Sequence, residues 1–211
     1  KKKKKTKVIK KIMKVHHLHS LPIAVTTTKI LTNQEKTRLY EEPYEVVSGS
    51  STLVSKDKQL LNKPWLKQAK YFMDSIAYEY VKDVLQIDND FRMTHSWMTK
   101  GMTNGIHPLH AHKSCLFSVA HYLDGKGRLT FDFNRSRIGE GMNFAFDNHT
   151  FNWSNADRWY FDTKPKTTII FPGWVKHEGS HFDGFRSMLG ANYFLTGDVG
   201  KGSEQVDNIK L

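Results

Sequence analysis

Four side chains in the second half of this sequence have the types and spacing needed to hold a metal ion beside an anion. His110 and His112 are one residue apart in the run HPLHAHKSCLFSVAHYL, His177 follows in FPGWVKH, and Arg186 lies nine residues further on. Alternate residues of a strand point to the same face, so the pattern predicts that His110 and His112 present two imidazoles to one point. The distant third imidazole and the arginine would complete an open metal site with an anion-binding group.

Two further residues of the same run are not assigned to the metal site. His107 has the opposite parity to His110 and His112, and it precedes Pro108, which interrupts strand pairing. Cys115 is interpreted as a small buried hydrophobe in preference to a soft extra metal ligand.

Neutral imidazole suits iron, zinc, copper and nickel. Three protein ligands leave positions open for water or substrate, which is typical of a catalytic metal and not of a closed structural one. A buried Arg186 would bind a carboxylate through two hydrogen bonds, and strand parity places Met188, Gly190 and Asn192 on its face. An ordinary surface ion pair is the alternative for Arg186, and the spacing leaves both interpretations open.

Helices are expected in the first half of the chain. Thr32 and Glu35 form a capping-box pattern that predicts a helix ending near Glu42, before Pro43. A second helix is predicted from about Pro64 to Leu85, because apolar residues recur there at spacings of three and four. Its apolar stripe consists of Trp65, Ala69, Phe72, Ile76, Tyr80 and Val84.

Strands are expected mainly after residue 90, where short β-branched and aromatic runs alternate with turn signals. Gly125-Lys126-Gly127 is interpreted as a hairpin turn, and residues 134–158 as a long loop of functional interest. This pattern predicts a mostly β sandwich, barrel or jelly roll with flanking N-terminal helices. The expected strands are Leu21–Thr28, Phe91–Thr99, Ile106–His112, Leu116–Asp124, Arg128–Phe133, Trp159–Thr163, Thr167–Phe171, Trp174–His177 and Phe185–Thr196.

The positive charge of the chain is concentrated at its start. The net charge is +11, but residues 1–14 hold nine lysines and no acid, which leaves 23 − 21 = +2 for the rest. We therefore expect a flexible Lys-rich arm at 1–14, one domain at 15–196 and a polar tail at 197–211. Nucleic acid or acidic lipid would be contacted only through the arm, and the His16, His17 and His19 cluster beside it is interpreted as solvated.

The composition also favours a particular cellular setting. A single cysteine excludes an internal disulfide framework and fits a reducing interior, in which Fe(II) persists. No run of 18 apolar residues is present, so no membrane-spanning helix is expected. A cytoplasmic location is predicted from these features.

The motifs of this sequence, and their order along the chain, resemble those of the Fe(II)- and 2-oxoglutarate-dependent oxygenases, and in particular those of small oxygenases of marine phages and bacteria. Those have a Ser-Trp stretch, HxH, a Ser-Gly-x-Tyr-Tyr strand, Phe-Pro-x-Trp-x-x-His, and then Arg with Asn six residues later. The resemblance covers about residues 20–196. The matching positions here are Ser96-Trp97, His110 and His112, Ser118 to Tyr122, Phe171 to His177, and Arg186 with Asn192.

The resemblance implies a double-stranded β-helix fold and a definite chemistry. His110, His112 and His177 would hold Fe(II), 2-oxoglutarate would chelate the iron, and Arg186 would bind its far carboxylate. Reaction with O2 would convert 2-oxoglutarate to succinate and CO2 and would oxidise a C–H bond of a second substrate. The substrate is left open between a small molecule, a peptidyl residue and a nucleobase, and a phage-encoded enzyme would act in the host cytoplasm.

Several positions depart from that family's pattern. The second ligand is usually Asp or Glu, so with His112 the iron site would be less negative. Val119 and His121 replace a Gly and a Tyr, and His121, with parity opposite to Tyr122, is interpreted as packing. Met188 replaces the usual Ser, so the anion site would depend on Arg186 with other groups such as Asn192 and Asn104. A three-His metal enzyme without 2-oxoglutarate and a degenerate jelly-roll binding module with a basic arm are the alternatives.

Overall fold

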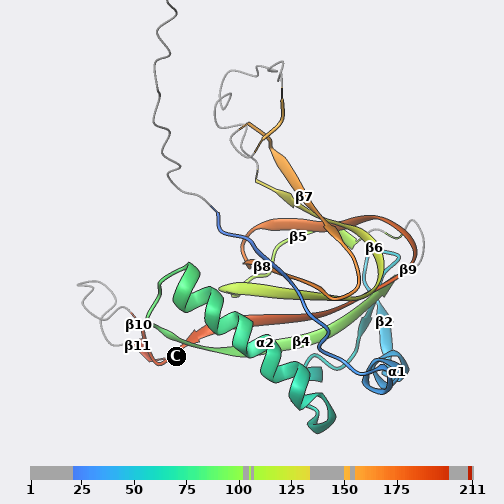
Figure 1. Ribbon diagram of the computed structural model, residues 1–211, viewed down its shortest axis with the longest axis horizontal. Coiled ribbons are helices and arrows are strands. Elements are labelled where there is room, and N and C mark those ends of the chain that lie inside the picture. Colours follow the sequence, from blue (N-terminus) through green and yellow to red (C-terminus); the bar gives the residue numbers. More distant parts are fainter. Residues whose placement is uncertain are drawn as a thin grey trace, which may run out of the picture.

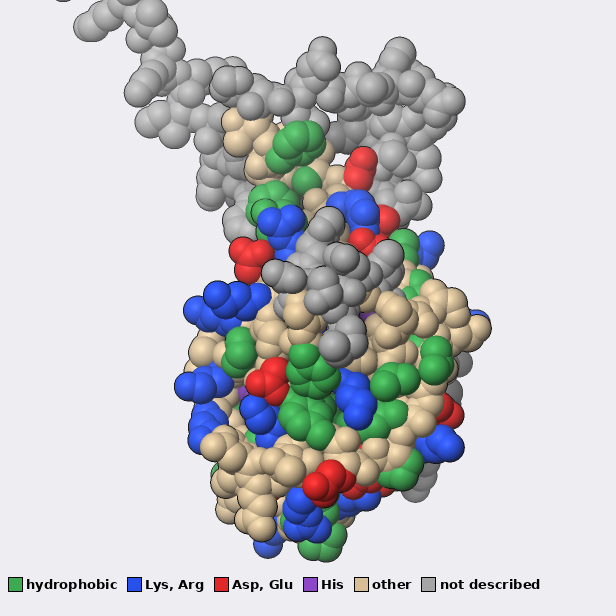
Figure 2. Space-filling view, turned by 90° about the vertical axis from the view of Figure 1, so that its right-hand side faces the viewer, with side chains coloured by type: hydrophobic (Ala, Val, Ile, Leu, Met, Phe, Trp, Pro, Cys, Tyr) green, Lys and Arg blue, Asp and Glu red, His purple; other side chains and the backbone are tan. Residues whose placement is uncertain are grey.

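The computed structural model describes residues 21–101, 105, 107–133, 150–152, 155–199 and 209–210, without the side chains of 181–183 and 209–210. The Lys-rich arm, the cluster at His16 to His19, Asn104 and most of the expected loop at 134–158 lie outside the described residues. In Figure 2, Lys and Arg side chains are spread over the visible face with acidic and apolar side chains between them. No helix among the described residues has the length and apolar character needed to cross a membrane.

Nine strands of the described chain form one antiparallel sheet with the strand order β1-β8-β6-β9-β4-β3-β2, to which β5 adds beside β9 and β7 beside β6 (Figure 1). The expected double-stranded β-helix is confirmed. A separate pair of short strands, β10 and β11, forms within the expected polar tail. The strands are β1 (Ala24–Thr27), β2 (Tyr44–Val46), β3 (Leu53–Ser55), β4 (Asp90–Gly101), β5 (His107–His110), β6 (Phe117–Asp132), β7 (Arg158–Thr163), β8 (Thr167–Pro172), β9 (Lys176–Thr196), β10 (Asp198–Val199) and β11 (Ile209–Lys210).

Two long strands, β6 and β9, bend so that each contributes to both walls of the fold. The first half of β6 pairs with β8 and the second half with β7, while β9 pairs with β6 along nearly its whole length. The predicted hairpin turn at Gly125-Lys126-Gly127 is therefore wrong, because the chain continues there as one bent strand. Gly125 has φ 79°, and a Cβ on it would collide with the carbonyl O of Phe185. Gly125 therefore allows β6 to lie close to β9, and it does not mark a reversal of the chain.

The helices cover one wall of the sheet (Figure 1). Helix α1 (Asn33–Glu41) begins with the predicted capping box of Thr32 and Glu35. The predicted second helix consists of three consecutive elements, which are the 3-10 turn η2 (Pro64–Leu66), the α-helix α2 (Lys67–Glu79) and the π-helical turn η3 (Tyr80–Val84). Another 3-10 turn, η1 (Leu60–Asn62), precedes them. Val84 was expected on the apolar stripe but is half exposed, because the wider π turn moves it off the buried face.

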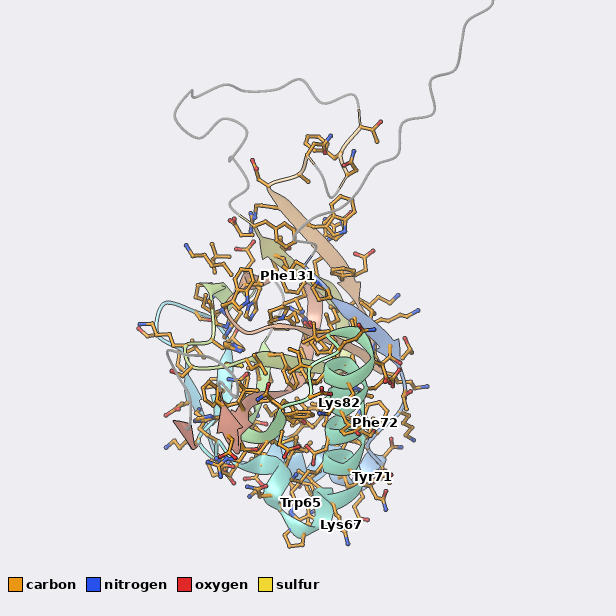
Figure 3. The ribbon with its side chains drawn as sticks, turned by 90° about the vertical axis from the view of Figure 1, so that its left-hand side faces the viewer. Trp65, Lys67, Tyr71, Phe72, Lys82 and Phe131 are labelled. Atoms are coloured by element: carbon orange, nitrogen blue, oxygen red, sulfur yellow. The ribbon has the colours of Figure 1, made fainter. Side chains whose placement is uncertain are left out.

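Strand β6 separates two apolar clusters because both of its faces are buried. Phe117, Val119 and Leu123 face the cluster packed against α2, whereas Ala120 and Tyr122 face a second cluster between the walls. Figure 3 shows Phe131, a member of the second cluster, on the sheet, Phe72 on α2, and Trp65 on the turn η2 that precedes it. The second cluster surrounds the candidate site.

His121 lies on the α2 side of β6, as its parity predicts. Its ring meets Phe72 edge to face, and its Nδ1 is 2.7 Å from Thr168 Oγ1. Burial lowers the pKa of His121 from 6.5 to about 4. These contacts support the interpretation of His121 as a packing residue.

The His121 pKa predicts acid sensitivity of the fold. Between pH 6.5 and 4 the unfolded chain binds a proton at His121 that the folded chain does not, so stability falls as the pH falls through this range. From pH 7 to 4.5 the contribution is about 2 kcal/mol. In urea unfolding of metal-free protein, His121→Asn should lose less stability on acidification than the wild type by about this amount. Equal losses in the two proteins would contradict the assignment.

Candidate metal centre

Three imidazoles converge between the two walls of the sheet. The ligand atoms of His110, His112 and His177 all lie within 4.8 Å of one another. His110 on β5 is directly opposite His177 on β9, and the Nε2 atoms of His110 and His112 are 3.2 Å apart. The structure therefore brings together the three histidines that the sequence selected.

His112 reaches the cluster by a route different from the one predicted. Strand β5 ends at His110, so the two histidines are not alternate residues of one strand. Instead, the backbone N–H of His112 donates to the carbonyl O of Gly173, 2.8 Å away, in the turn that leads to His177. Gly173 allows this turn to lie close to the chain, because a Cβ there would be only 2.6 Å from Cys115 Sγ. The shared turn fixes His112 relative to His177.

Hydrogen bonds at the three Nδ1 atoms determine where the ring protons lie. His110 Nδ1 is 2.8 Å from Pro108 O and His177 Nδ1 is 2.9 Å from Val175 O, and both partners can only accept. His112 Nδ1 is 2.5 Å from Ser118 Oγ, which donates its own proton to Asn192 Oδ1. All three Nδ1 atoms therefore carry protons in this network, which leaves the three Nε2 lone pairs available to a metal ion.

The electrostatic environment keeps these rings neutral. Burial lowers the pKa of His112 to about 4, with a further contribution from His110. Burial also lowers the pKa of His110, and it lowers that of His177 well below the ordinary value. Metal binding requires neutral imidazole, so the three ligands are ready at neutral pH. This donor set fits Fe(II) and other divalent transition metals.

No carboxylate or thiol belongs to the three-histidine group among the residues that the structure describes. Cys115 points its thiol at the carbonyl O of Phe117, 3.0 Å away, and burial raises its pKa. Its surroundings agree with a small, partly buried packing residue more than with a ligand.

Ser118 connects His112 to Asn192, so it should influence metal affinity without touching the metal. Ser118→Ala removes the acceptor for His112 Nδ1–H, and we expect about 10–100-fold weaker metal binding. Titration of Zn(II) against a competing chelator measures this change. Ser180→Ala is the matched control, because Ser180 is also buried in the sheet and its hydroxyl is 3.4 Å from Thr130 Oγ1. Equal affinities of the two variants would contradict the role of Ser118.

Arg186 shares a pocket with the three histidines and is only 8% exposed. Its guanidinium lies over the Tyr122 ring at 4.8 Å from the centroid, and its Nη2 is 3.3 Å from Arg128 O and 3.4 Å from Thr163 Oγ1. Burial raises the pKa of Tyr122, and the Arg186 charge opposes that rise. The alternative of a surface ion pair is therefore wrong, because the side chain is buried inside the fold.

The two other predicted anion-site residues are placed differently. Asn192 lies on the strand of Arg186, and its side-chain oxygen accepts from Ser118, which connects it to the metal ligands. Its contact with an anion stays a prediction. Asn104 lies outside the described residues.

Tyr122 and Trp97 were not among the predicted site residues, but both line the pocket. Tyr122 follows Ser118 by four residues on β6, so strand parity alone would have placed it on the same face. The Trp97 ring meets His112 edge to face, with centroids 5.5 Å apart. It lies over Gly190, where a Cβ would approach the indole to 2.7 Å. Gly190 therefore makes room for Trp97 and not for a neighbour of Arg186.

His107 was expected on the opposite face from His110 and His112, and that expectation is wrong. His107 is opposite Gly179 and His110 is opposite His177, so three steps along β5 match two steps along β9. This bulge at Pro108 adds one residue and reverses the parity. His107 consequently lines the pocket, with its ring 4.6 Å from that of His110.

Comparison with known proteins adds a family match. Residues 95–189 match the model of the family described as "Putative 2OG-Fe(II) oxygenase". This segment includes the three histidines, Trp97, Tyr122 and Arg186. No curated protein sequence matches the chain.

Solved structures with the same fold share little sequence with the chain. A Pseudomonas putida prolyl-4-hydroxylase is 12% identical with a TM-score of 0.58, covering 84% of this chain and 95% of its own. HygX from Streptomyces hygroscopicus with nickel and 2-oxoglutarate bound is 12% identical with a TM-score of 0.55, covering 90% and 91%. A Burkholderia pseudomallei oxidoreductase of the 2OG-Fe(II) oxygenase family is 13% identical with a TM-score of 0.55, covering 82% and 84%. At these identities the likeness establishes the fold.

Proposed function

We propose that the chain, whose residues 95–189 match the 2OG-Fe(II) oxygenase family, couples decarboxylation of 2-oxoglutarate to oxidation of a second substrate. The observation that carries the proposal is the joint placement of a neutral three-histidine group and a buried arginine in one pocket. The histidines suit a divalent metal, and the arginine suits the far carboxylate of a dicarboxylic acid.

His110, His112 and His177 would hold Fe(II) through Nε2. Bound together, Fe(II) and 2-oxoglutarate would supply the chemistry in which R–H, O2 and 2-oxoglutarate give R–OH, succinate and CO2. The chain positions and protects these reactants. Pro108 O, Val175 O and Ser118 orient the three rings, which keeps the ligand set assembled before the metal binds.

Arg186 would orient the cosubstrate within the pocket. Its planar guanidinium matches a carboxylate through two parallel hydrogen bonds, and its burial strengthens them by excluding water. Tyr122 stacks against the guanidinium and limits its movement. Apolar residues of the same pocket, including Leu129, Phe171 and Met188, exclude water from the surrounding space.

The oxidised substrate would be a small molecule, a peptidyl residue or a nucleobase. The solved structures of the same fold include a prolyl-4-hydroxylase and a HygX complex with hygromycin B bound, so the fold alone does not select one of these classes. The single cysteine and the Fe(II) requirement fit a reducing compartment, and we assign the reaction to the cytoplasm.

Anaerobic titration of metal-free protein with Fe(II) and then 2-oxoglutarate tests this function. We expect one Fe(II) per chain, followed by a weak visible charge-transfer band when 2-oxoglutarate chelates the iron. Iron binding without the band would favour a three-histidine enzyme that does not use 2-oxoglutarate. Failure to bind any divalent metal would overturn the oxygenase proposal and favour a binding module.

A further inference from the structure

His107 is a pocket residue that the proposed function leaves without a role. Its Nδ1 is buried and has no hydrogen-bond partner among the residues that the structure describes. A buried polar nitrogen without a partner is destabilising, so such groups in folded proteins commonly bind a ligand or water. The same pocket holds the three metal ligands and Arg186.

The bulge at Pro108 places His107 beside the metal ligands but outside their group. Its ring meets that of His110 edge to face, with the centroids 4.6 Å apart and the planes at 79°. The cluster whose ligand atoms lie within 4.8 Å consists of His110, His112 and His177 without it. His107 is therefore a neighbour of the metal site and not a fourth ligand in this arrangement.

Arg186 and His107 lie over the same glycine. A Cβ built on Gly179 would be 2.9 Å from Arg186 Nη1 and 3.5 Å from His107 Cβ. Gly179 is also the residue opposite His107 in the β5–β9 pair. The missing side chain at Gly179 therefore leaves space that the Arg186 guanidinium occupies, beside the Cβ of His107.

The chemistry of this pair favours an anion over a second metal ion. The nearby Arg186 charge repels cations, and an imidazole N–H can donate a hydrogen bond to an anion. Met188, two residues after Arg186 on the same strand face, also lines the pocket but has no hydrogen-bond donor. His107 is thus a donor close enough to share an anion with Arg186.

We propose that His107 binds the far carboxylate of 2-oxoglutarate together with Arg186, by donating a hydrogen bond from Nδ1–H to one carboxylate oxygen. This inference rests on the proposed function. It assigns the second hydrogen-bonding position of the cosubstrate site to a histidine supplied by the β5 bulge.

Calorimetric titration of two keto acids into anaerobic Fe(II)-loaded protein tests the inference without measuring turnover. The acids are 2-oxoglutarate and 2-oxopentanoate, which has the same chain length with a methyl group in place of the far carboxylate. His107→Phe keeps a ring but has no donor, and it should weaken 2-oxoglutarate binding about tenfold or more while leaving 2-oxopentanoate binding within about twofold. His107→Asn offers an N–H near the position of Nδ1, and it should recover most of the lost affinity.

The outcomes separate this inference from the proposed function. Unchanged 2-oxoglutarate binding in His107→Phe, with the wild type preferring 2-oxoglutarate, would overturn the role of His107 and leave the proposed function standing. Equal weakening of both keto acids, or loss of Fe(II) from His107→Phe and His107→Asn, would also overturn it, because His107 would then act through the metal site. A wild type that does not distinguish the two acids would overturn both proposals.

Discussion

Replacing His177 with alanine is expected to abolish metal binding while leaving the chain folded. His177 is 4% exposed and its Nε2 is one of three converging lone pairs, so two imidazoles would remain where the metal needs three. The lost packing and the lost Nδ1 hydrogen bond should cost about 1–3 kcal/mol of stability, less than a typical domain possesses. Metal content after dialysis and urea unfolding of the metal-free protein measure the two effects separately.

His121→Ala is the matched control for this experiment. His121 is 2% exposed, lies in the same sheet and also has a hydrogen-bonded Nδ1, but it faces α2 on the other side of β6. It should lose a similar amount of stability and keep full metal binding. Full metal occupancy in His177→Ala, or equal metal loss in the two variants, would contradict the assignment of the ligands.

The pair His121 and Tyr122 shows how far strand parity determines the site. Both residues are buried neighbours on β6, yet one contacts α2 and the other lines the metal pocket. The rule that successive side chains alternate between faces predicts this separation from sequence alone. The same rule places Arg186 and Met188 together, and the structure puts both in the pocket.

Predictions from strand parity were wrong where the backbone departs from a regular strand. The bulge at Pro108 directs His107 towards the site. Strand β5 ends at His110, so His112 is positioned by its hydrogen bond to the turn at Gly173 and not by strand pairing. Gly125 was interpreted as part of a turn because glycine is common in turns. The close approach of Phe185, which is far along the chain, leaves no local signal in the sequence. Bulges, strand ends and close approaches depend on partners that are distant in sequence, so local patterns cannot reveal them.

Arg186→Met should remove the preference of the protein for 2-oxoglutarate over 2-oxopentanoate. Two charge-assisted hydrogen bonds to the far carboxylate would be lost, each worth about 1.5–3 kcal/mol, which corresponds to a loss of about 100-fold or more in 2-oxoglutarate affinity. Binding of 2-oxopentanoate should change little, because it has no far carboxylate. Calorimetry with anaerobic Fe(II)-loaded protein measures both ligands, and Fe(II) stoichiometry should stay at the wild-type value.

Arg128→Met separates a specific bond to the carboxylate from a general effect of charge. Arg128 is on β6, its guanidinium lies over the Tyr160 ring at 4.0 Å, and its backbone carbonyl accepts a hydrogen bond from Arg186. This variant removes the same charge but should keep the affinity for 2-oxoglutarate within about twofold. The affinity of Arg186→Lys for 2-oxoglutarate should lie between those of Arg186→Met and Arg128→Met, because an ammonium group keeps the charge but cannot form two parallel hydrogen bonds. Equal losses in Arg186→Met and Arg128→Met would indicate that the net charge of the domain, and not the buried guanidinium, attracts the cosubstrate.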